Sequence, residues 1–164
     1  MNNLSVATCL KIIFLISLIS IISAYFIEYI LGHQPCNLCL IERIPYGLAL
    51  FLIVLNYTFS KNEHFIILLL ILTFIFSFTI SFYHFGIEQD FFEESAVCAL
   101  KNTSEIISKE ELLKQLQVKN VSCKDVTFRI FGFSLTAINI FINLFILFFL
   151  TKIFTNYENF KKKN

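Results

Sequence analysis

Four stretches of this sequence contain no aspartate, glutamate, lysine or arginine, and they constrain the fold more than any other feature. They cover residues 12–27, 44–60, 65–87 and 130–151, which are 16, 17, 23 and 22 residues long. A helix needs about 20 residues to cross a hydrocarbon core about 30 Å thick. The last two stretches reach that length unaided, and the first two reach it when a flanking charge such as Glu28 lies at the headgroup level. The sequence therefore predicts four transmembrane helices.

The same stretches argue against a transmembrane β-barrel, because barrel strands alternate polar and apolar residues and these stretches do not. Apolar residues make up 57% of the chain, whereas a soluble domain has roughly 45–50%. A net charge of +1 does not favour a nucleic-acid partner. We expect one all-α membrane domain over residues 1–164, a bundle of four transmembrane helices at about 10–31, 40–60, 65–86 and 130–154, with outer loops at about 32–39 and 87–129.

The lysines indicate an orientation for this bundle. The first apolar stretch lacks a small-x-small cleavage site, so we expect it to be retained as a helix rather than removed as a signal peptide. If the chain starts inside, segments 1–11, 61–64 and 152–164 carry six lysines in 28 residues, and segments 32–43 and 88–129 carry seven lysines and arginines in 54 residues. By density, though not by raw count, the positive-inside rule then places both termini in the cytoplasm.

The five cysteines divide between the two sides of this topology. Cys36, Cys39, Cys98 and Cys123 lie on the outer side, and Cys9 lies alone on the inner side, where we interpret it as a small apolar residue. Disulfides persist outside the cytosol and not within it. An even set on the outer face and a single cysteine on the inner face is the distribution that a redox boundary produces.

Several chemistries compete for the four outer cysteines. Zinc ribbons usually have two close pairs, but 24 residues separate Cys98 from Cys123. Covalent haem attachment needs histidine directly after Cys-x-x-Cys, and position 40 is leucine. A structural disulfide is a reasonable interpretation for Cys98 and Cys123. It is a poor one for Cys36 and Cys39, because a bridge that closes so short a loop removes little entropy from the unfolded chain. The sequence favours redox chemistry over metal binding for this pair.

The residues around the Cys-x-x-Cys pair favour a reactive thiolate. Pro35 at a first helical position would place Cys36 near the positive end of a helix. Arg43 follows Cys39 by four residues, which puts both on one face if the helix already runs there. A cation beside a thiol stabilises the thiolate.

Pro45 leaves that geometry open. A proline would clash with the carbonyl four residues before it, so the helix either kinks or begins near Glu42. Arg43 also has other interpretations, as a headgroup anchor or as the ion-pair partner of Glu42.

The third apolar stretch ends in "FYHFGIEQ", where His84 precedes Glu88 by four residues. One interpretation is an ordinary interfacial histidine. The other is a polar group that faces a quinone or proton site, because ionisable groups within membrane spans are commonly functional.

The long outer loop contains "SKEELLKQLQ", in which Ser108 and Glu111 form a capping box. Apolar residues follow on one helical face, so we expect a short amphipathic helix, either on the membrane surface or as part of the loop alone.

Three motifs together resemble the DsbB family, the bacterial inner-membrane proteins that reoxidise the periplasmic thiol oxidase DsbA and pass the electrons to quinone. "PCNLCLIER" is similar to the family signature Pro-Cys-x-x-Cys-x-x-x-Arg, and "YHFGIEQ" is similar to the polar end of the third helix. "CKDVTFRIFG" is similar to the family pattern of a loop cysteine, an aromatic residue and a glycine, at Cys123, Phe128 and Gly132. The resemblance covers about residues 10–155.

The resemblance implies a role for each outer cysteine. Cys98 would be attacked by the thiolate of a reduced DsbA-like partner, and Cys123 would be its disulfide partner in the loop. Electrons would then pass by thiol–disulfide exchange to a second disulfide, Cys36–Cys39.

The resemblance also implies a cofactor, ubiquinone or menaquinone, and no metal. Cys39 would face the quinone as a thiolate, Arg43 would stabilise it, and His84 would be a second residue of the quinone site. The protein would be a multi-pass protein of the bacterial inner membrane that sustains disulfide bond formation.

Two other functions are compatible with the same residues. A vitamin-K-epoxide-reductase-like oxidase also has four helices and four cysteines, but there the Cys-x-x-Cys usually follows the loop pair, and here it precedes it. A non-catalytic membrane protein with a disulfide-bonded loop or a metal site is the second. Bound quinone would favour an oxidase, and stoichiometric zinc would favour the non-catalytic protein.

Overall fold

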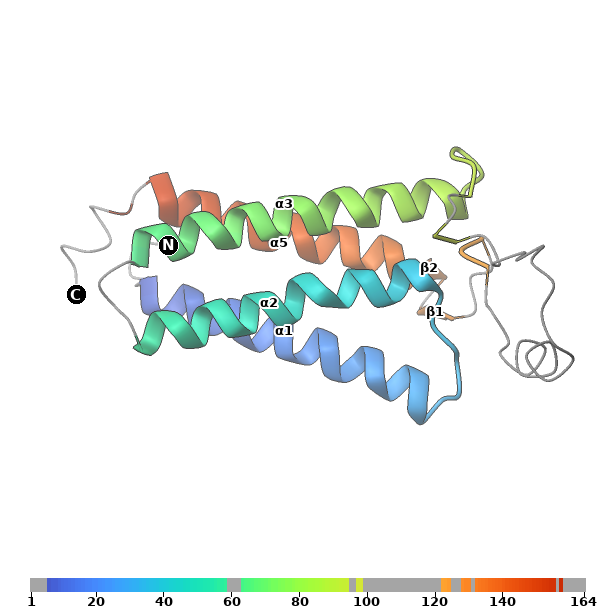
Figure 1. The fold of residues 1–164 in the computed structure, drawn as a ribbon, viewed down its shortest axis with the longest axis horizontal. Coiled ribbons are helices and arrows are strands. Elements are labelled where there is room, and N and C mark those ends of the chain that lie inside the picture. The colour runs from blue at the N-terminus through green and yellow to red at the C-terminus, as the bar shows by residue number, and fades with distance from the viewer. Residues whose placement is uncertain are drawn as a thin grey trace, which may run out of the picture.

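The chain forms four long helices. The computed structural model describes residues 6–58, 63–94, 97–98, 122–124, 128–130, 132–155 and 157. The helices within these residues are α1 (Val6–Tyr29), α2 (Asn37–Thr58), α3 (Glu63–Glu88) and α5 (Leu135–Thr155), as Figure 1 shows. Each is long and apolar enough to cross a membrane. The predicted four-helix membrane fold is therefore confirmed.

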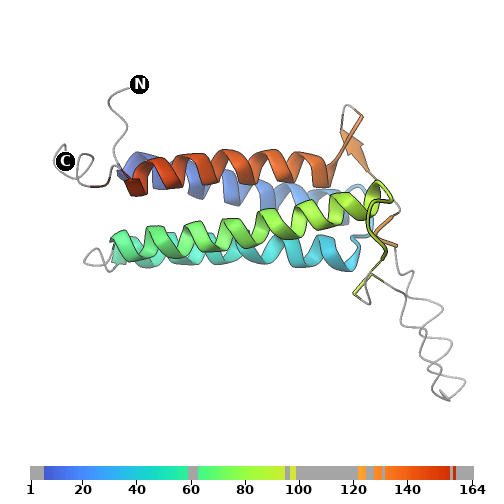
Figure 2. The same cartoon turned by 90° about the horizontal axis from the view of Figure 1, so that it is seen from above.

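The helices pack side by side as a bundle, which two perpendicular views show (Figures 1 and 2). Helix α3 packs against both α5 and α2, and α2 packs against α1, whereas α1 and α5 contact each other only slightly. Buried side chains from all four helices meet in the core, among them Ile13, Ile53, Phe74 and Ile146. The core thus runs along the bundle axis, and every helix contributes to it.

The outer surface of the bundle is also apolar. Phe51, Phe76 and Phe141, from α2, α3 and α5, are each more than half exposed. Such side chains suit contact with lipid, and the helical backbone satisfies its own polar groups in a medium without water. The sequence is apolar on both the inward and outward faces, which is typical of a membrane-spanning helix.

Helix α2 begins well before Pro45, although a proline disfavours the helical turn that precedes it. It runs from Asn37 to Thr58 with Pro45 inside it. The backbone N–H of Leu40 donates to the carbonyl of Cys36 at 3.2 Å, so the first turn forms directly after Cys36. The alternative in which the helix begins near Glu42 is therefore wrong, and Cys39, Glu42 and Pro45 lie on one continuous helix.

A small antiparallel ladder, which was not predicted from the sequence, precedes the last helix. Strands β1 (Arg129–Ile130) and β2 (Phe133–Ser134) pair across a turn in which Gly132 has a φ of 87°. That left-handed conformation is readily available to glycine. Ser134 then caps α5, because its Oγ accepts a hydrogen bond from the N–H of Ala137 at 3.2 Å. The amphipathic helix predicted in the loop near Ser108 lies outside the described residues.

Candidate functional site

The four outer cysteines form two disulfides at one end of the bundle. Cys36 is joined to Cys39, and Cys98 is joined to Cys123. Both disulfides belong to one small apolar cluster, in which Leu38 and Ile87 are also buried. The first helix begins and the last one ends at the opposite end (Figure 1), where the free thiol of Cys9 is buried in the main core.

Cys36 occupies the N-cap position of α2. Its sulfur accepts a hydrogen bond from the backbone N–H of Cys39 at 3.2 Å, as a capping side chain does. The unpaired N–H groups of a first helical turn carry partial positive charge. When the disulfide opens, this position favours negative charge on the Cys36 sulfur, which is the nucleophilic form of a thiol.

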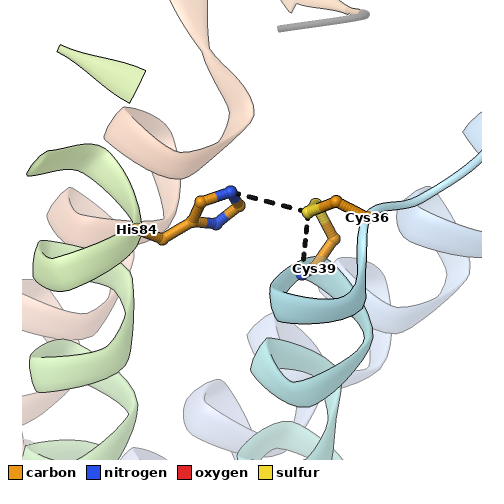
Figure 3. Close-up of side chains that lie close together, drawn as sticks. All are labelled: Cys36, Cys39 and His84. Atoms are coloured by element: carbon orange, nitrogen blue, oxygen red, sulfur yellow. Dashed lines mark hydrogen bonds between the residues drawn. A yellow bond between two sulfur atoms is a disulfide. The ribbon is translucent and has the colours of Figure 1, made fainter. Parts of the chain in front are cut away.

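His84 links this disulfide to the third helix. From α3 the ring points toward the first turn of α2, and its Nε2 lies 3.5 Å from the sulfur of Cys36 (Figure 3). Its Nδ1 lies 2.9 Å from a carboxylate oxygen of Glu42. Only 2% of the His84 side chain is exposed. This histidine is therefore not an interfacial side chain but a buried group between a disulfide and a carboxylate.

Glu42 is held by a network of buried polar side chains. The amide of Asn139 donates to the second carboxylate oxygen of Glu42 at 2.8 Å and to the hydroxyl of Ser81 at 2.8 Å. Tyr46 in turn donates to the amide oxygen of Asn139. A buried carboxylate is tolerated where such partners replace its water. The network joins α2, α3 and α5 and fixes the ring of His84.

Arg43 pairs with Glu28 and not with Glu42, its neighbour in the sequence. Its guanidinium donates to a carboxylate oxygen of Glu28 on α1 at 2.5 Å and lies over the ring of Tyr25, 5.1 Å from the ring centre. The interpretation that pairs Arg43 with Glu42 is therefore wrong. The ion pair is mostly shielded, with 17% of the Arg43 side chain and 21% of the Glu28 side chain exposed.

A cavity of about 320 Å³ opens beside these groups. Its polar end includes Cys36, Cys39, Arg43, His84 and Glu88, and its apolar wall comes from α1 and α5. Pockets for small organic ligands usually occupy about 300–1,000 Å³ and combine apolar walls with a few polar groups. The volume and the lining of this cavity meet both conditions.

Polar contacts hold the described parts of the long loop against the end of the bundle. The ammonium of Lys124 lies 2.6 Å from a carboxylate oxygen of Asp90, which follows α3. The hydrogen bond and charge of Asp90 raise the pKa of Lys124 above its ordinary value. The amide of Asn37 donates to the carbonyl of Val97 at 2.8 Å, next to Cys98 in the chain. These contacts place the loop disulfide beside the start of α2.

Three features of this site were not predicted from the sequence: Glu28 as the partner of Arg43, Glu42 as a buried carboxylate beside His84, and the contribution of Asn139. A signal for Asn139 existed, since Asn139 and Asn143 lie four residues apart in an otherwise apolar span. Polar side chains within a membrane span tend to face the bundle interior and to pair there. The partners themselves could not be read from that spacing.

A comparison with protein families identifies the chain. The model of the family "Disulfide bond formation protein DsbB" matches residues 7–153, which is nearly the whole sequence. This chain belongs to the DsbB family. Membership implies disulfide formation by a membrane protein, and with the four spans it points to a multi-pass protein of the inner membrane with thiol oxidoreductase activity.

One curated relative supports the comparison without adding a function. An uncharacterized protein of Rickettsia prowazekii (strain Madrid E) is 28% identical over 137 residues, which cover 82% of this chain and 80% of the relative. No solved structure matches the chain.

Proposed function

We propose that this member of the DsbB family reoxidises a soluble DsbA-like thiol oxidase and passes the electrons to a membrane quinone. The observation that carries the proposal is the meeting of both disulfides at one cavity. Cys36, Cys39 and Cys123 all line it, and both pairs share one apolar cluster. A chain that only needed a disulfide-bonded loop would not require a second, short disulfide beside that loop and a ligand-sized cavity.

The first exchange takes place at the loop disulfide. A thiolate of the reduced partner attacks the sulfur of Cys98, the Cys98–Cys123 bond breaks, and the Cys123 sulfur leaves as a thiolate. The second thiol of the partner then attacks the mixed disulfide and releases Cys98. The partner has lost two electrons, and the loop pair holds them as two thiols. Such exchanges require access and a good leaving thiolate.

The second exchange moves the electrons to the helix pair. A loop thiolate attacks the Cys36–Cys39 disulfide, the loop disulfide re-forms, and the helix pair is reduced. The positive end of α2 stabilises the released Cys36 sulfur, and His84 Nε2, 3.5 Å away, can hold the proton of that thiol. Glu42 keeps the ring in place through Nδ1. The two pairs therefore act in series.

The cavity is where the electrons would leave the chain. Its walls fit a quinone, because apolar side chains of α1 and α5 face the polar groups of Arg43 and His84. Ile19 of α1 lines the cavity and is 60% exposed, as expected if the cavity opens toward lipid beside this helix. A bound ubiquinone or menaquinone supplies an acceptor for two electrons and two protons. Arg43 provides positive charge and forked donors, and the helix pair returns to the disulfide.

The orientation follows from the same proposal. The partner is periplasmic, so the four disulfide cysteines face the periplasm and both termini lie in the cytoplasm. Impermeant thiol labelling of intact cells after reduction tests this. We expect label on Cys98 and none on Cys9, and the reverse labelling would invert the topology.

Reoxidation of a reduced DsbA-like protein tests the function itself. Membranes containing this chain, supplied with quinone, should oxidise the partner catalytically, and membranes with Cys39→Ser should not. The matched control is Cys9→Ser, because Cys9 lies at the opposite end of the bundle and we expect normal turnover. Equal rates with and without the chain would reject the proposed function.

A further inference from the structure

The side chains of Cys36, Cys39 and His84 have the arrangement of a metal site. Their ligand atoms, two sulfurs and one imidazole nitrogen, all lie within 4.8 Å of one another. Zinc binds sulfur at about 2.3 Å and imidazole nitrogen at about 2.0–2.1 Å, so a tetrahedral site separates these two ligands by about 3.5 Å. His84 Nε2 lies 3.5 Å from the Cys36 sulfur. In Figure 3 the ring is aimed at the two cysteines from the facing helix.

The other side of the histidine ring has the partner that a metal ligand needs. Metal-binding histidines usually give their second ring N–H to a carboxylate, which fixes the tautomer and the ring orientation. Here Nδ1 lies 2.9 Å from Glu42 Oε1, and Asn139 holds the other oxygen of the same carboxylate at 2.8 Å. This arrangement fixes the ring with Nε2 toward the sulfurs.

Glu88 supplies a candidate for a fourth ligand. Its Oε1 lies 4.0 Å from His84 Nε2, and 6% of its side chain is exposed. Its Oε2 is buried and has no hydrogen-bond partner among the described residues. A buried oxygen that lacks a partner calls for an explanation, such as an ion. Glu88 lines the same cavity as the cysteines and the histidine, but its oxygens lie outside the three-residue cluster, so its side chain would have to move to bind the same ion.

We propose that the reduced chain binds one Zn²⁺ through Cys36, Cys39 and His84, with Glu88 or water in the fourth position. The site is controlled by oxidation state, because disulfide sulfurs are not thiolate ligands and the bond must open first. Binding involves no electron transfer: the two thiols lose their protons to solvent and two sulfur–zinc bonds form. Zinc then occupies the sulfurs that must re-form the disulfide, so it inhibits reoxidation of the helix pair. Only this inhibition rests on the proposed function.

The test uses the full chain in detergent, in a Cys98→Ser/Cys123→Ser background so that loop thiols cannot bind metal. The protein is reduced, freed of reductant without oxygen, and titrated with zinc against a coloured chelator. We expect one equivalent to bind the reduced chain, and the affinity of the oxidised chain to be at least about 100-fold lower. Cobalt in place of zinc should give thiolate charge-transfer absorption and the visible bands of a tetrahedral ion. Equal affinity of the two oxidation states, or no stoichiometric binding, overturns the proposal.

Three variants assign the ligands. Cys36→Ser and His84→Ala should each lower the zinc affinity at least about 100-fold. Glu42→Gln should lower it about 10- to 100-fold, because it only orients the histidine. The matched control is His33→Ala, since the His33 ring lines the same cavity but stacks near Phe128, 5.1 Å away, and does not belong to the cluster. If His84→Ala and His33→Ala bind zinc equally well, the histidine is not a ligand and the site is wrong.

A single-turnover reaction separates this inference from the proposed function. The reduced background variant is mixed with quinone and no thiol partner, with zinc or with chelator. We expect oxidation of the helix pair in chelator, a rate at least about tenfold lower with saturating zinc, and recovery when chelator is added. Zinc binding without oxidation in chelator would reject the quinone reaction and leave the metal site standing. Oxidation that saturating zinc does not slow would reject the inhibition.

Discussion

The two disulfides differ in what surrounds them, although they share one cluster. Cys36 and Cys39 lie at the first turn of a membrane helix, against a buried histidine and carboxylate. The segments that carry Cys98 and Cys123 are held by polar contacts at the bundle surface, such as the exposed ion pair of Lys124 with Asp90. Rigid, buried groups can tune a thiol for an acceptor that arrives from the lipid. A surface segment can meet a partner that arrives from water once it moves to uncover Cys98, which is only 5% exposed here. We infer that the helix pair is suited to an acceptor in the membrane and the loop pair to a partner in water.

The largest effect should come from removing one cysteine of each pair. Cys98→Ser and Cys39→Ser should both abolish turnover with the DsbA-like partner, because the proposed electron path runs through both pairs in series. They should differ in a single turnover, where Cys98→Ser still allows quinone to oxidise the reduced helix pair and Cys39→Ser does not. Trapping experiments add a second distinction: no stable mixed disulfide with the partner should form in Cys98→Ser. A trapped complex through Cys36 in that variant would mean that the roles are assigned to the wrong cysteines.

A smaller loss is expected when the carboxylate beside His84 loses its charge. Hydrogen bonds to charged groups contribute about 1.5–3 kcal/mol, against about 0.5–1.5 kcal/mol for neutral ones. The difference corresponds to about a tenfold lower rate of helix-pair oxidation in Glu42→Gln, while the loop disulfide should open at its normal rate.

A matched control for Glu42→Gln exists on the far end of the bundle. Glu63 accepts a hydrogen bond from Tyr157 at 2.9 Å, remote from either disulfide. Glu63→Gln should therefore leave quinone reduction unchanged. Equal loss in both variants would mean that carboxylate substitution harms the fold and not the site.

The ion pair between Glu28 of α1 and Arg43 of α2 should have a smaller effect, and it should act on quinone binding. Partly exposed pairs contribute up to about 1 kcal/mol, so Glu28→Gln should raise the KM for quinone about twofold to fivefold and leave the opening of the loop disulfide unchanged. Steady-state rates against quinone concentration measure it. Arg43→Lys should be the more damaging change, because an ammonium cannot reproduce a planar guanidinium that binds Glu28 and covers Tyr25. Identical KM values for Glu28→Gln and the parent would show that the pair does not position Arg43.

The smallest effect is expected on the water-facing side. About half of the Lys124 side chain is exposed, and its raised pKa comes first from the hydrogen bond to Asp90. The ion pair is therefore complete below the ordinary lysine pKa and is lost only as pH rises through the raised value. Opening of the loop disulfide by a soluble dithiol should change little in Lys124→Ala at neutral pH. A strong acceleration in that variant would show that the surface contacts restrain the loop disulfide more than its apolar packing does.

The sequence predicted the helices and the cysteines well for physical reasons. The length of a span without charges, such as residues 65–87, is set by the thickness of the bilayer. Such a span can therefore be recognised without knowing which helices pack against it. The pairing of Arg43 with Glu28 could not be predicted, because it depends on how α1 and α2 are rotated against each other. These helices are apolar on all sides, so their hydrophobic pattern gives little information about rotation. The ladder before α5 was missed because strands of two residues leave almost no periodic signal.

One measurement tests whether electrons move from the loop pair to the helix pair. The oxidised chain is mixed with stoichiometric reduced partner without quinone or oxygen, quenched over time, and the thiols of each pair are counted after alkylation and digestion. We expect Cys36 and Cys39 to become thiols in the parent chain and to stay oxidised in Cys98→Ser/Cys123→Ser. Equal reduction of Cys36 and Cys39 in both proteins would contradict this expectation, because the partner would then reach the helix pair without the loop.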